Sequence, residues 1–170
     1  MTGRGLCTAS RHVADCLSAI ERMDGQLKAM ITVTADSAYA AARAEDEARD
    51  AGRAVGPLAG MTVALKDVIR TAGVRTTNGS DIDRDMVPDV DAEVVRRLKE
   101  AGAIIVGKAN LHEYAYGGTS QNPFHGACRN PWDLSRIPGG SSGGSGAAGA
   151  PPMCDVLPRT HTPGSRGVAG

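Results

Sequence analysis

The order of elements in the middle of the chain predicts an α/β fold. Met61–Ile69 has the composition of an apolar strand, Asp91–Ala101 repeats its apolar residues at helical spacing, and Ala103–Val106 is a short, wholly apolar segment typical of a buried strand. A strand, a helix and a second strand in this order form one layered unit. We therefore expect Lys66 and Val106 to lie on neighbouring or near-neighbouring strands of a sheet covered by helices on both faces.

Two further helices are expected before this unit, and Asp91 is expected to cap the helix within it. The first would have Ser10 as its N-cap and end at Gly25, and the second would follow Thr34 and span Ala35–Asp50. Each helix would pack through one apolar stripe. The inward-facing residues are expected to be Val13, Cys16, Leu17 and Ile20 in the first helix and Ala38, Ala41, Ala42 and Ala48 in the second.

Composition limits the classes of function. The 170 residues are 41% hydrophobic but only 3% aromatic, which predicts one domain with an aliphatic, alanine-rich core. Nineteen basic and nineteen acidic side chains cancel, so no net charge draws the chain to nucleic acid or to a membrane. The four cysteines form no C-x-x-C pair and no zinc-finger spacing. We expect reduced thiols, no metal, no cofactor and a cytoplasmic location.

One lysine lies inside the expected strand Met61–Ile69. With a period of two residues, Lys66 points to the same side as Thr62 and Ala64, whereas Leu65 and Asp67 point to the other side. A lysine on an apolar strand usually extends its amine from an edge into water. The alternative is a desolvated base, for which the pKa must fall from about 10.4 to near 7 or 8, at roughly 3 to 5 kcal/mol. The residues alone leave both interpretations open.

A glycine and serine run, Gly139–Gly146, is the most unusual stretch of the chain. Such a run is usually a flexible linker. Here it lies between Asn130–Asp133, which holds the only tryptophan, and a set of alanines typical of a helix. We therefore favour an ordered loop that brings backbone and hydroxyl groups close to a ligand. Ser142 and Ser145 are expected to support this loop through hydrogen bonds.

Two common motifs overlap in this run. Gly144–Gly149 matches G-x-G-x-x-G, but a dinucleotide site needs a strand before it and an acidic residue about 20 residues later. Gly139–Gly143 matches the G-x-S-x-G of α/β-hydrolases, which also needs a preceding strand and a later acid and histidine. The only such pair, Asp155 and His161, lies in a proline-rich tail. Neither motif is favoured.

Turn residues dominate after Gly107, and we expect this region to line a pocket. Within it, Gly117, Gly118 and Thr119 are candidates for substrate binding. Three histidines, His12, His112 and His125, belong to no recognisable triad or metal spacing, and we interpret them as surface or structural residues.

Five segments, in this order and spacing, closely resemble the amidase signature family. They are Gly56–Val68, Asp91–Val95, Gly107–Glu113, Arg129–Asp133 and Pro138–Ala148. The resemblance covers about residues 10 to 150 and is far more specific than any single motif. It implies a mixed β-sheet covered by helices on both faces, of which this chain holds the N-terminal portion. It also implies hydrolysis of a small-molecule carboxamide, with the A subunit of a tRNA-dependent amidotransferase as an alternative.

The resemblance implies a serine, cis-serine and lysine triad. The lysine base falls on Lys66 and the cis-serine on Ser141, while the nucleophile falls on Ser165, 24 residues after Ser141. In this mechanism neutral lysine accepts a proton from the cis-serine, which accepts one from the nucleophile. The family also implies a homodimer or amidotransferase subunits as partners.

The chain departs from the family after Ala150. Residues 1–150 match the N-terminal part of an amidase signature domain, whereas residues 151–170 are expected to be a divergent, disordered tail of a truncated or frame-shifted product. Pro163 replaces a glycine of the oxyanion hole and His161 replaces an aspartate. Loss of one oxyanion donor typically costs about 100- to 1000-fold in rate. We expect a poorly stable chain with weak or no activity, and a non-catalytic fragment is a further alternative.

Overall fold

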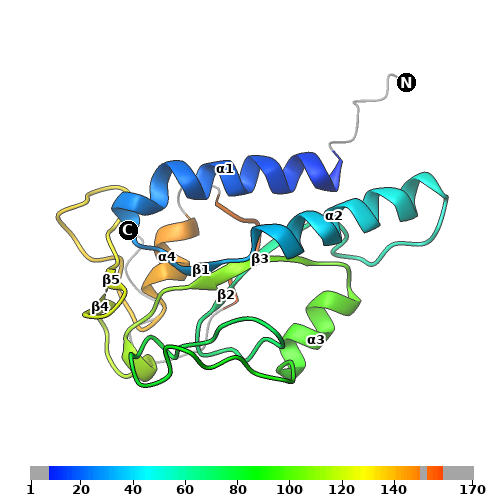
Figure 1. Cartoon of the computed structure of the whole chain (residues 1–170). Coiled ribbons are helices and arrows are strands. Elements are labelled where there is room, and N and C mark those ends of the chain that lie inside the picture. The colour runs from blue at the N-terminus through cyan, green and yellow to red at the C-terminus, as the bar shows by residue number, and fades with distance from the viewer. Residues whose placement is uncertain (1–7, 150–152, 159–170) are drawn as a thin grey trace.

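A computed structural model describes residues 8–149 and 153–158 of the chain. Figure 1 shows helices on both sides of a small sheet. The elements, in chain order, are α1 (Ala9–Leu27), β1 (Met30–Val33), α2 (Ala35–Asp50), β2 (Thr62–Lys66), α3 (Glu93–Glu100), β3 (Ile104–Ala109), the short 3₁₀ helix η1 (Glu113–Ala115), β4 (Gln121–Asn122), β5 (Gly126–Ala127) and α4 (Gly143–Gly149).

The main sheet has the order β1-β3-β2. β2 and β3 are parallel neighbours, as the strand–helix–strand order predicts, and β1 pairs with β3 in the antiparallel sense. The sheet is therefore mixed, and the α/β class and the neighbouring positions of the two predicted strands are confirmed. β4 and β5 form a separate two-stranded hairpin.

Two apolar clusters cover the two faces of the main sheet. α1, α2 and α4 lie together on one face, where Ala64 and Val106 are among the strand residues of the larger cluster. α3 lies on the opposite face, where Val63 and Leu65 join the smaller cluster (Figure 1). Neighbouring residues of β2 thus point to opposite faces, in the alternation expected of a strand.

The bounds of α2 agree with the prediction, but those of α1 differ. Thr8 caps α1 by accepting a hydrogen bond from the Arg11 amide, two residues before the expected cap. The helix also continues through Gly25 to Leu27, and its C-cap Lys28 adopts a left-handed conformation with φ 51°. Asp24 favours this end because its carboxylate accepts the amides of the two residues that follow Lys28.

Two smaller predictions about the helices are wrong. In α2, Ala38 and Ala42 are fully buried as expected, but Ala41 is exposed and Ala48 is half-buried. The cap of α3 is Ala92, not Asp91. The Asp91 carboxylate instead accepts the Ala72 amide and contacts the Lys99 amine, so it ties α3 to the loop that follows β2.

Strand β3 is longer than its sequence indicates. Gly107 was expected to begin a turn, yet β3 continues to Ala109, and the β2–β3 register shifts by one residue between Val63 and Ala64. Gly107 is required here because a Cβ atom would overlap the carbonyl oxygen of Thr32 on β1. A close approach of backbones, rather than a turn, therefore explains this glycine.

Residues 153–158 pack against the outer edge of β2. Met153 is fully buried, and Val156 forms a parallel bridge with Val63. The amides of Asp155 and Val156 donate to the carbonyl of Thr62. These contacts differ from the disordered tail expected of residues 151–170, because apolar side chains anchor this part of it. Among the helices that the structure describes, none has the length and apolar character that crossing a membrane requires.

Candidate active site

Lys66 ends strand β2 and meets the glycine and serine run. Its Nζ lies 2.6 Å from Oγ of Ser141, and both side chains are fully buried. β2 carries Lys66 toward the face covered by α4, on the same side as Ala64, as the period of two predicts. The amine does not reach water from an edge, so that interpretation is wrong.

Burial changes the protonation of this lysine. Removal from water disfavours the ammonium ion, which lowers the pKa of Lys66 from 10.5 to about 8. A substantial fraction of the amine is therefore neutral in weakly alkaline solution, and a neutral amine can accept a proton. Proton exchange with Ser141 is chemically possible at a separation of 2.6 Å between the nitrogen and the oxygen.

The glycine and serine run is ordered against the sheet. Ser141 lies fully buried just before α4, which spans most of the remaining run, and the peptide bond between Gly140 and Ser141 is cis. A Cβ atom on Gly144 would overlap the backbone of Ala29 and Asn110. The glycines thus allow close backbone packing, and the flexible-linker interpretation is wrong.

The other two serines of the run behave differently from expectation. Ser142 and Ser145 are buried, but neither side-chain oxygen has a hydrogen-bond partner within residues 8–149 and 153–158. Their hydroxyls therefore do not support the loop in the predicted way. The Ser142 backbone contributes instead, since its carbonyl accepts the Gly146 amide inside α4.

The loop Gly117–Thr119 lies beside the cis peptide. A Cβ atom on Gly140 would come within 2.8 Å of the Thr119 amide nitrogen. His112 connects the two segments: its amide donates to the Ser141 carbonyl, and its Nδ1 lies 3.4 Å from Oγ1 of Thr119. The three candidate substrate-binding residues are exposed, so they form an accessible surface next to Ser141.

Both rival motifs lack their structural context. The described residues directly before Gly139 form no strand, so Gly139–Gly143 is no strand-to-helix elbow. All of Gly144–Gly149 lies inside α4 rather than at a turn that follows a strand. Asp155 contacts His12 of α1 with 2.7 Å between Oδ2 and Nε2, so His12 is a structural residue that also anchors residues 153–158.

Ser165, His161 and Pro163 lie outside the described residues. The structure therefore brings together two of the three predicted catalytic residues, Lys66 and Ser141. In the described part of the chain, no group of three or more His, Cys, Asp or Glu side chains is placed to hold a metal ion.

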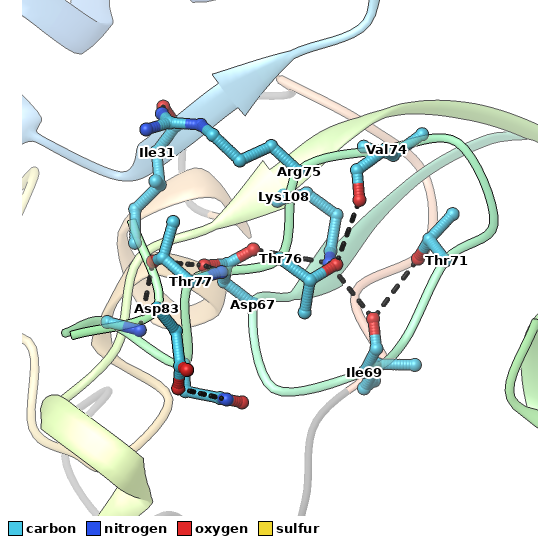
Figure 2. Close-up of polar contacts among 12 residues, drawn as sticks. Ile31, Asp67, Ile69, Thr71, Val74, Arg75, Thr76, Thr77, Asp83 and Lys108 are labelled. Atoms are coloured by element: carbon cyan, nitrogen blue, oxygen red, sulfur yellow. Dashed lines mark hydrogen bonds and ion pairs between the residues drawn. The ribbon is translucent and has the colours of Figure 1, made fainter. Parts of the chain in front are cut away.

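The sequence analysis missed a second buried lysine. Lys108 on β3 is fully buried, and its Nζ lies 3.2 Å from Oδ1 of Asp67, the residue that follows Lys66 (Figure 2). The available signal was a lysine two residues after the predicted apolar strand, together with an aspartate expected on the opposite side from Lys66. Gly107 concealed it, because glycine before lysine is typical of a turn.

A mixed sheet with a buried amine beside a serine-rich segment defines a class: an α/β protein with a lysine–serine site. The family model for amidases matches residues 11–165. The chain therefore belongs to the amidase signature family, whose members are hydrolases that act on carbon–nitrogen bonds.

Similar proteins agree with this assignment. The A subunit of glutamyl-tRNA(Gln) amidotransferase from Moorella thermoacetica is 53% identical over 141 residues, which are 83% of this chain and 29% of that protein. The structure of the corresponding amidotransferase protein from Thermotoga maritima is 38% identical with a TM-score of 0.71, covering 86% of this chain and 29% of that one. The native peptide amidase of Stenotrophomonas maltophilia is 35% identical with a TM-score of 0.81, covering 88% and 32%. The chain spans about a third of the length of the curated relatives it matches.

Proposed function

We propose that this chain contributes to the hydrolysis of a small-molecule carboxamide, with Lys66 as the base, Ser141 as the proton relay and Ser165 as the nucleophile. The observation that carries the proposal is the 2.6 Å contact between Lys66 Nζ and Ser141 Oγ, both of whose side chains are fully buried. The pKa of Lys66, which burial lowers to about 8, supports the role of a base.

The proposed reaction has two stages, acylation and deacylation, and in each stage one proton passes to Lys66 and then returns. Ser165 Oγ attacks the amide carbon, its proton passes to Ser141, and the Ser141 proton passes to neutral Lys66. As the carbon–nitrogen bond breaks, the proton on Lys66 returns through Ser141 to the leaving amine, and ammonia departs when the amide is primary. Water then attacks the acyl-serine by the same proton route and releases a carboxylic acid.

The loop Gly117–Thr119 is proposed to contact the substrate. It is exposed, and it adjoins the peptide that carries Ser141. His112 supports this role because it contacts both segments, through the Ser141 carbonyl and the Thr119 hydroxyl. We expect Thr119→Ala to weaken substrate binding more than turnover, and therefore to raise KM more than it lowers kcat.

The test of the proposal is release of ammonia from a panel of primary aryl and aliphatic amides. We expect Ser141→Ala to lower the rate by at least about 100-fold, which is the low end for proton-transfer catalysis. Ser165→Ala should also abolish labelling by a fluorophosphonate probe, measured by intact mass. Ser135→Ala is the matched control, because Ser135 is an exposed serine outside the site.

Equal ammonia release by the wild-type chain, Ser141→Ala and Ser165→Ala would overturn the proposal. A rate too low to measure in the wild-type chain has its own test, since Pro163 is expected to remove an oxyanion donor. Pro163→Gly, combined with His161→Asp, should raise the rate by about 100- to 1000-fold. A chain that is folded and inactive even with both changes would favour the non-catalytic fragment.

A second candidate is the A subunit of an amidotransferase, in which the same site would release ammonia for a partner. The 53% identity to a protein named as such favours it. The partner would then be another chain of the amidotransferase or a second copy of this chain, in the cytoplasm. Co-expression with candidate partner chains separates the two functions: an amidotransferase component should co-purify with a partner, whereas a free amidase should be active alone.

A further inference from the structure

We propose that the buried ion pair of Lys108 and Asp67 is a positioning device for Lys66, built on the opposite face of the sheet. The inference rests on the proposed function, since it assigns Lys66 the role of a base. Neither Lys108 nor Asp67 would touch the substrate. Their role would be to hold the end of β2 so that the Lys66 amine stays directed at Ser141.

The first support is that both members of the ion pair make further hydrogen bonds to the surrounding residues. Lys108 Nζ donates to the Ile69 carbonyl at 2.9 Å and to the Thr76 hydroxyl at 2.6 Å, in addition to its contact with Asp67 Oδ1. Oδ2 of Asp67 accepts both the amide and the hydroxyl of Thr77, at 2.7 and 2.6 Å. Figure 2 shows these groups converging between β3 and the loop that follows β2.

The two oxygens of the Asp67 carboxylate are stabilised in different ways. Among the described residues, Oδ1 accepts no hydrogen bond, and the ammonium of Lys108 is the charge beside it. Both side chains have no exposed surface. Removal of Lys108 would therefore leave a buried, uncompensated carboxylate one residue away from Lys66.

The second support is the backbone around Lys66. The Lys66 carbonyl accepts the Ile69 amide at 2.9 Å, and the carbonyl of Ile69 is the group that Lys108 holds. On the other side, the Asp67 amide donates to the Ala109 carbonyl at 3.0 Å, and the Asp67 carbonyl accepts the Asn78 amide. The ion pair thus fixes the peptide that leaves Lys66.

The third support is the irregularity in β3. Val106 faces the larger cluster with α4, and simple alternation would place Lys108 on that same face, beside Lys66. The register shift at Gly107 instead pairs Lys108 with Leu65, which faces the smaller cluster. The shift places the second positive charge beside Asp67 and separates it from Lys66 by the sheet.

The charges predict the sign of each effect on Lys66. A lone Asp67 carboxylate favours the protonated amine, whereas a lone Lys108 ammonium disfavours it. These substitutions leave in place the other titratable groups on the segments packed around this region. They are His12 and Cys16 on α1, Cys154 and Asp155 in residues 153–158, His112 before η1, and His125, whose Nε2 lies 3.2 Å from the Thr77 hydroxyl.

The experiment titrates the lysines directly by NMR of the 170-residue chain labelled with ¹³C at the lysine ε-carbon. The chain has only four lysines, Lys28, Lys66, Lys99 and Lys108, so the signals can be assigned by single substitution. We expect Lys108→Met to raise the pKa of Lys66 by about one pH unit and Asp67→Asn to lower it by a similar amount. The double variant removes both charges and the positioning contacts together, so the Lys66 amine should be less desolvated and its pKa should lie above the wild-type value.

A merely structural ion pair would lower stability in both single variants without opposite changes in the Lys66 titration. Unchanged or parallel changes would therefore overturn the proposal. Thr77→Val covers the case in which a single variant does not fold, because it keeps both charges and removes one hydrogen bond to Asp67, together with the one that the Thr77 hydroxyl accepts from the Gly79 amide. It should raise the pKa of Lys66 by a smaller amount, and no change would also overturn the proposal.

This measurement is independent of turnover. If no variant of the chain releases ammonia but the opposite changes appear, the proposed function fails and the coupling between the ion pair and Lys66 stands. If ammonia release depends on Lys66 but its titration ignores Lys108 and Asp67, the proposed function stands and the positioning role fails.

Discussion

Lys66 and Lys108 lie on neighbouring strands, are fully buried, and differ in what surrounds their amines. The Lys66 amine contacts the neutral hydroxyl of Ser141, whereas Lys108 lies against the Asp67 carboxylate. Burial lowers the pKa of both lysines, but the Asp67 charge offsets part of the effect on Lys108. The Asp67 carboxylate therefore stabilises the ammonium form of Lys108, whereas burial beside a hydroxyl favours the neutral form of Lys66.

This difference suits Lys66 to the proposed role of a base and Lys108 to a structural role, although the two lysines lie on neighbouring strands. A buried amine beside a neutral hydroxyl is costly for folding but useful as a base, and a buried ion pair is inert but costly to break. The comparison predicts that equal substitutions at the two lysines have opposite consequences. Four experiments test this prediction.

Lys66→Met should lower amide hydrolysis by about 1000-fold or more, because the proton from Ser141 would have no acceptor. Stability should stay the same or rise, since the change removes a desolvated amine. Ammonia release and urea unfolding measure the two effects. Lys28→Met, at an exposed lysine directly after α1, is the control. Full activity of Lys66→Met would contradict the assignment of the base.

Lys108→Met should lower the free energy of unfolding by about 3 to 5 kcal/mol, because it leaves the Asp67 carboxylate buried without its counter-charge. The measurement is the urea midpoint at constant m-value. The double change Lys108→Met with Asp67→Leu should recover most of the loss. A Lys108→Met chain as stable as Lys66→Met would remove the distinction between the two faces.

Gly144→Ala should disturb only the Lys66 face. Its Cβ atom would overlap the backbone of Ala29 and Asn110, and overpacking of this kind costs about 1 to 3 kcal/mol. Because α4 would have to move, the contact between Lys66 and Ser141 should weaken and activity should fall. Gly25→Ala is the matched control: no atom lies within 4 Å of its added Cβ in helix α1, so it should be neutral or slightly stabilising.

The pH profile should show the smallest effect, about tenfold per pH unit. Since the proposed base accepts a proton only when it is neutral, kcat/KM should rise with pH and level off above a pKa of about 8. Stability should also rise between pH 8 and 10.5, because the unfolded chain binds the Lys66 proton in that window and the folded chain does not. Lys66→Met should lack this rise. A profile that falls across pH 8 would contradict a neutral-amine base.

Local sequence patterns predicted much of the fold and the position of Lys66, but not that of Lys108. Sequence pattern predicted both ends of α2 correctly, and alternation along β2 placed Lys66 and Asp67 on opposite sides. The end of α1 escaped prediction because an aspartate, rather than Gly25, terminates the helix. Lys108 escaped for a different reason. Its position depends on the β1 backbone approaching Gly107, a contact between segments far apart in sequence.

The candidate site was predictable only in part, for a similar reason. The resemblance to amidases identified Lys66 and Ser141, and the structure places their side chains in contact. No pattern in the sequence indicated that Ser142 and Ser145 would lack hydrogen bonds within the described residues, or that His12 would meet Asp155 across 143 residues. Such contacts follow from how segments pack, which local periodicity does not encode.

The segment 153–158 affects the tendency of the chain to aggregate. Val156 bridges Val63, and the amide of Ala64 donates to the Val156 carbonyl, so the outer row of β2 is occupied by the chain itself. An edge strand with unpaired backbone N–H and C=O groups can pair with extended segments of neighbouring molecules. A chain ending at Gly149 would expose Thr62–Lys66 in this way and should aggregate in a concentration-dependent manner. The six residues least expected to have structure thus keep the strand of the candidate base out of intermolecular sheets.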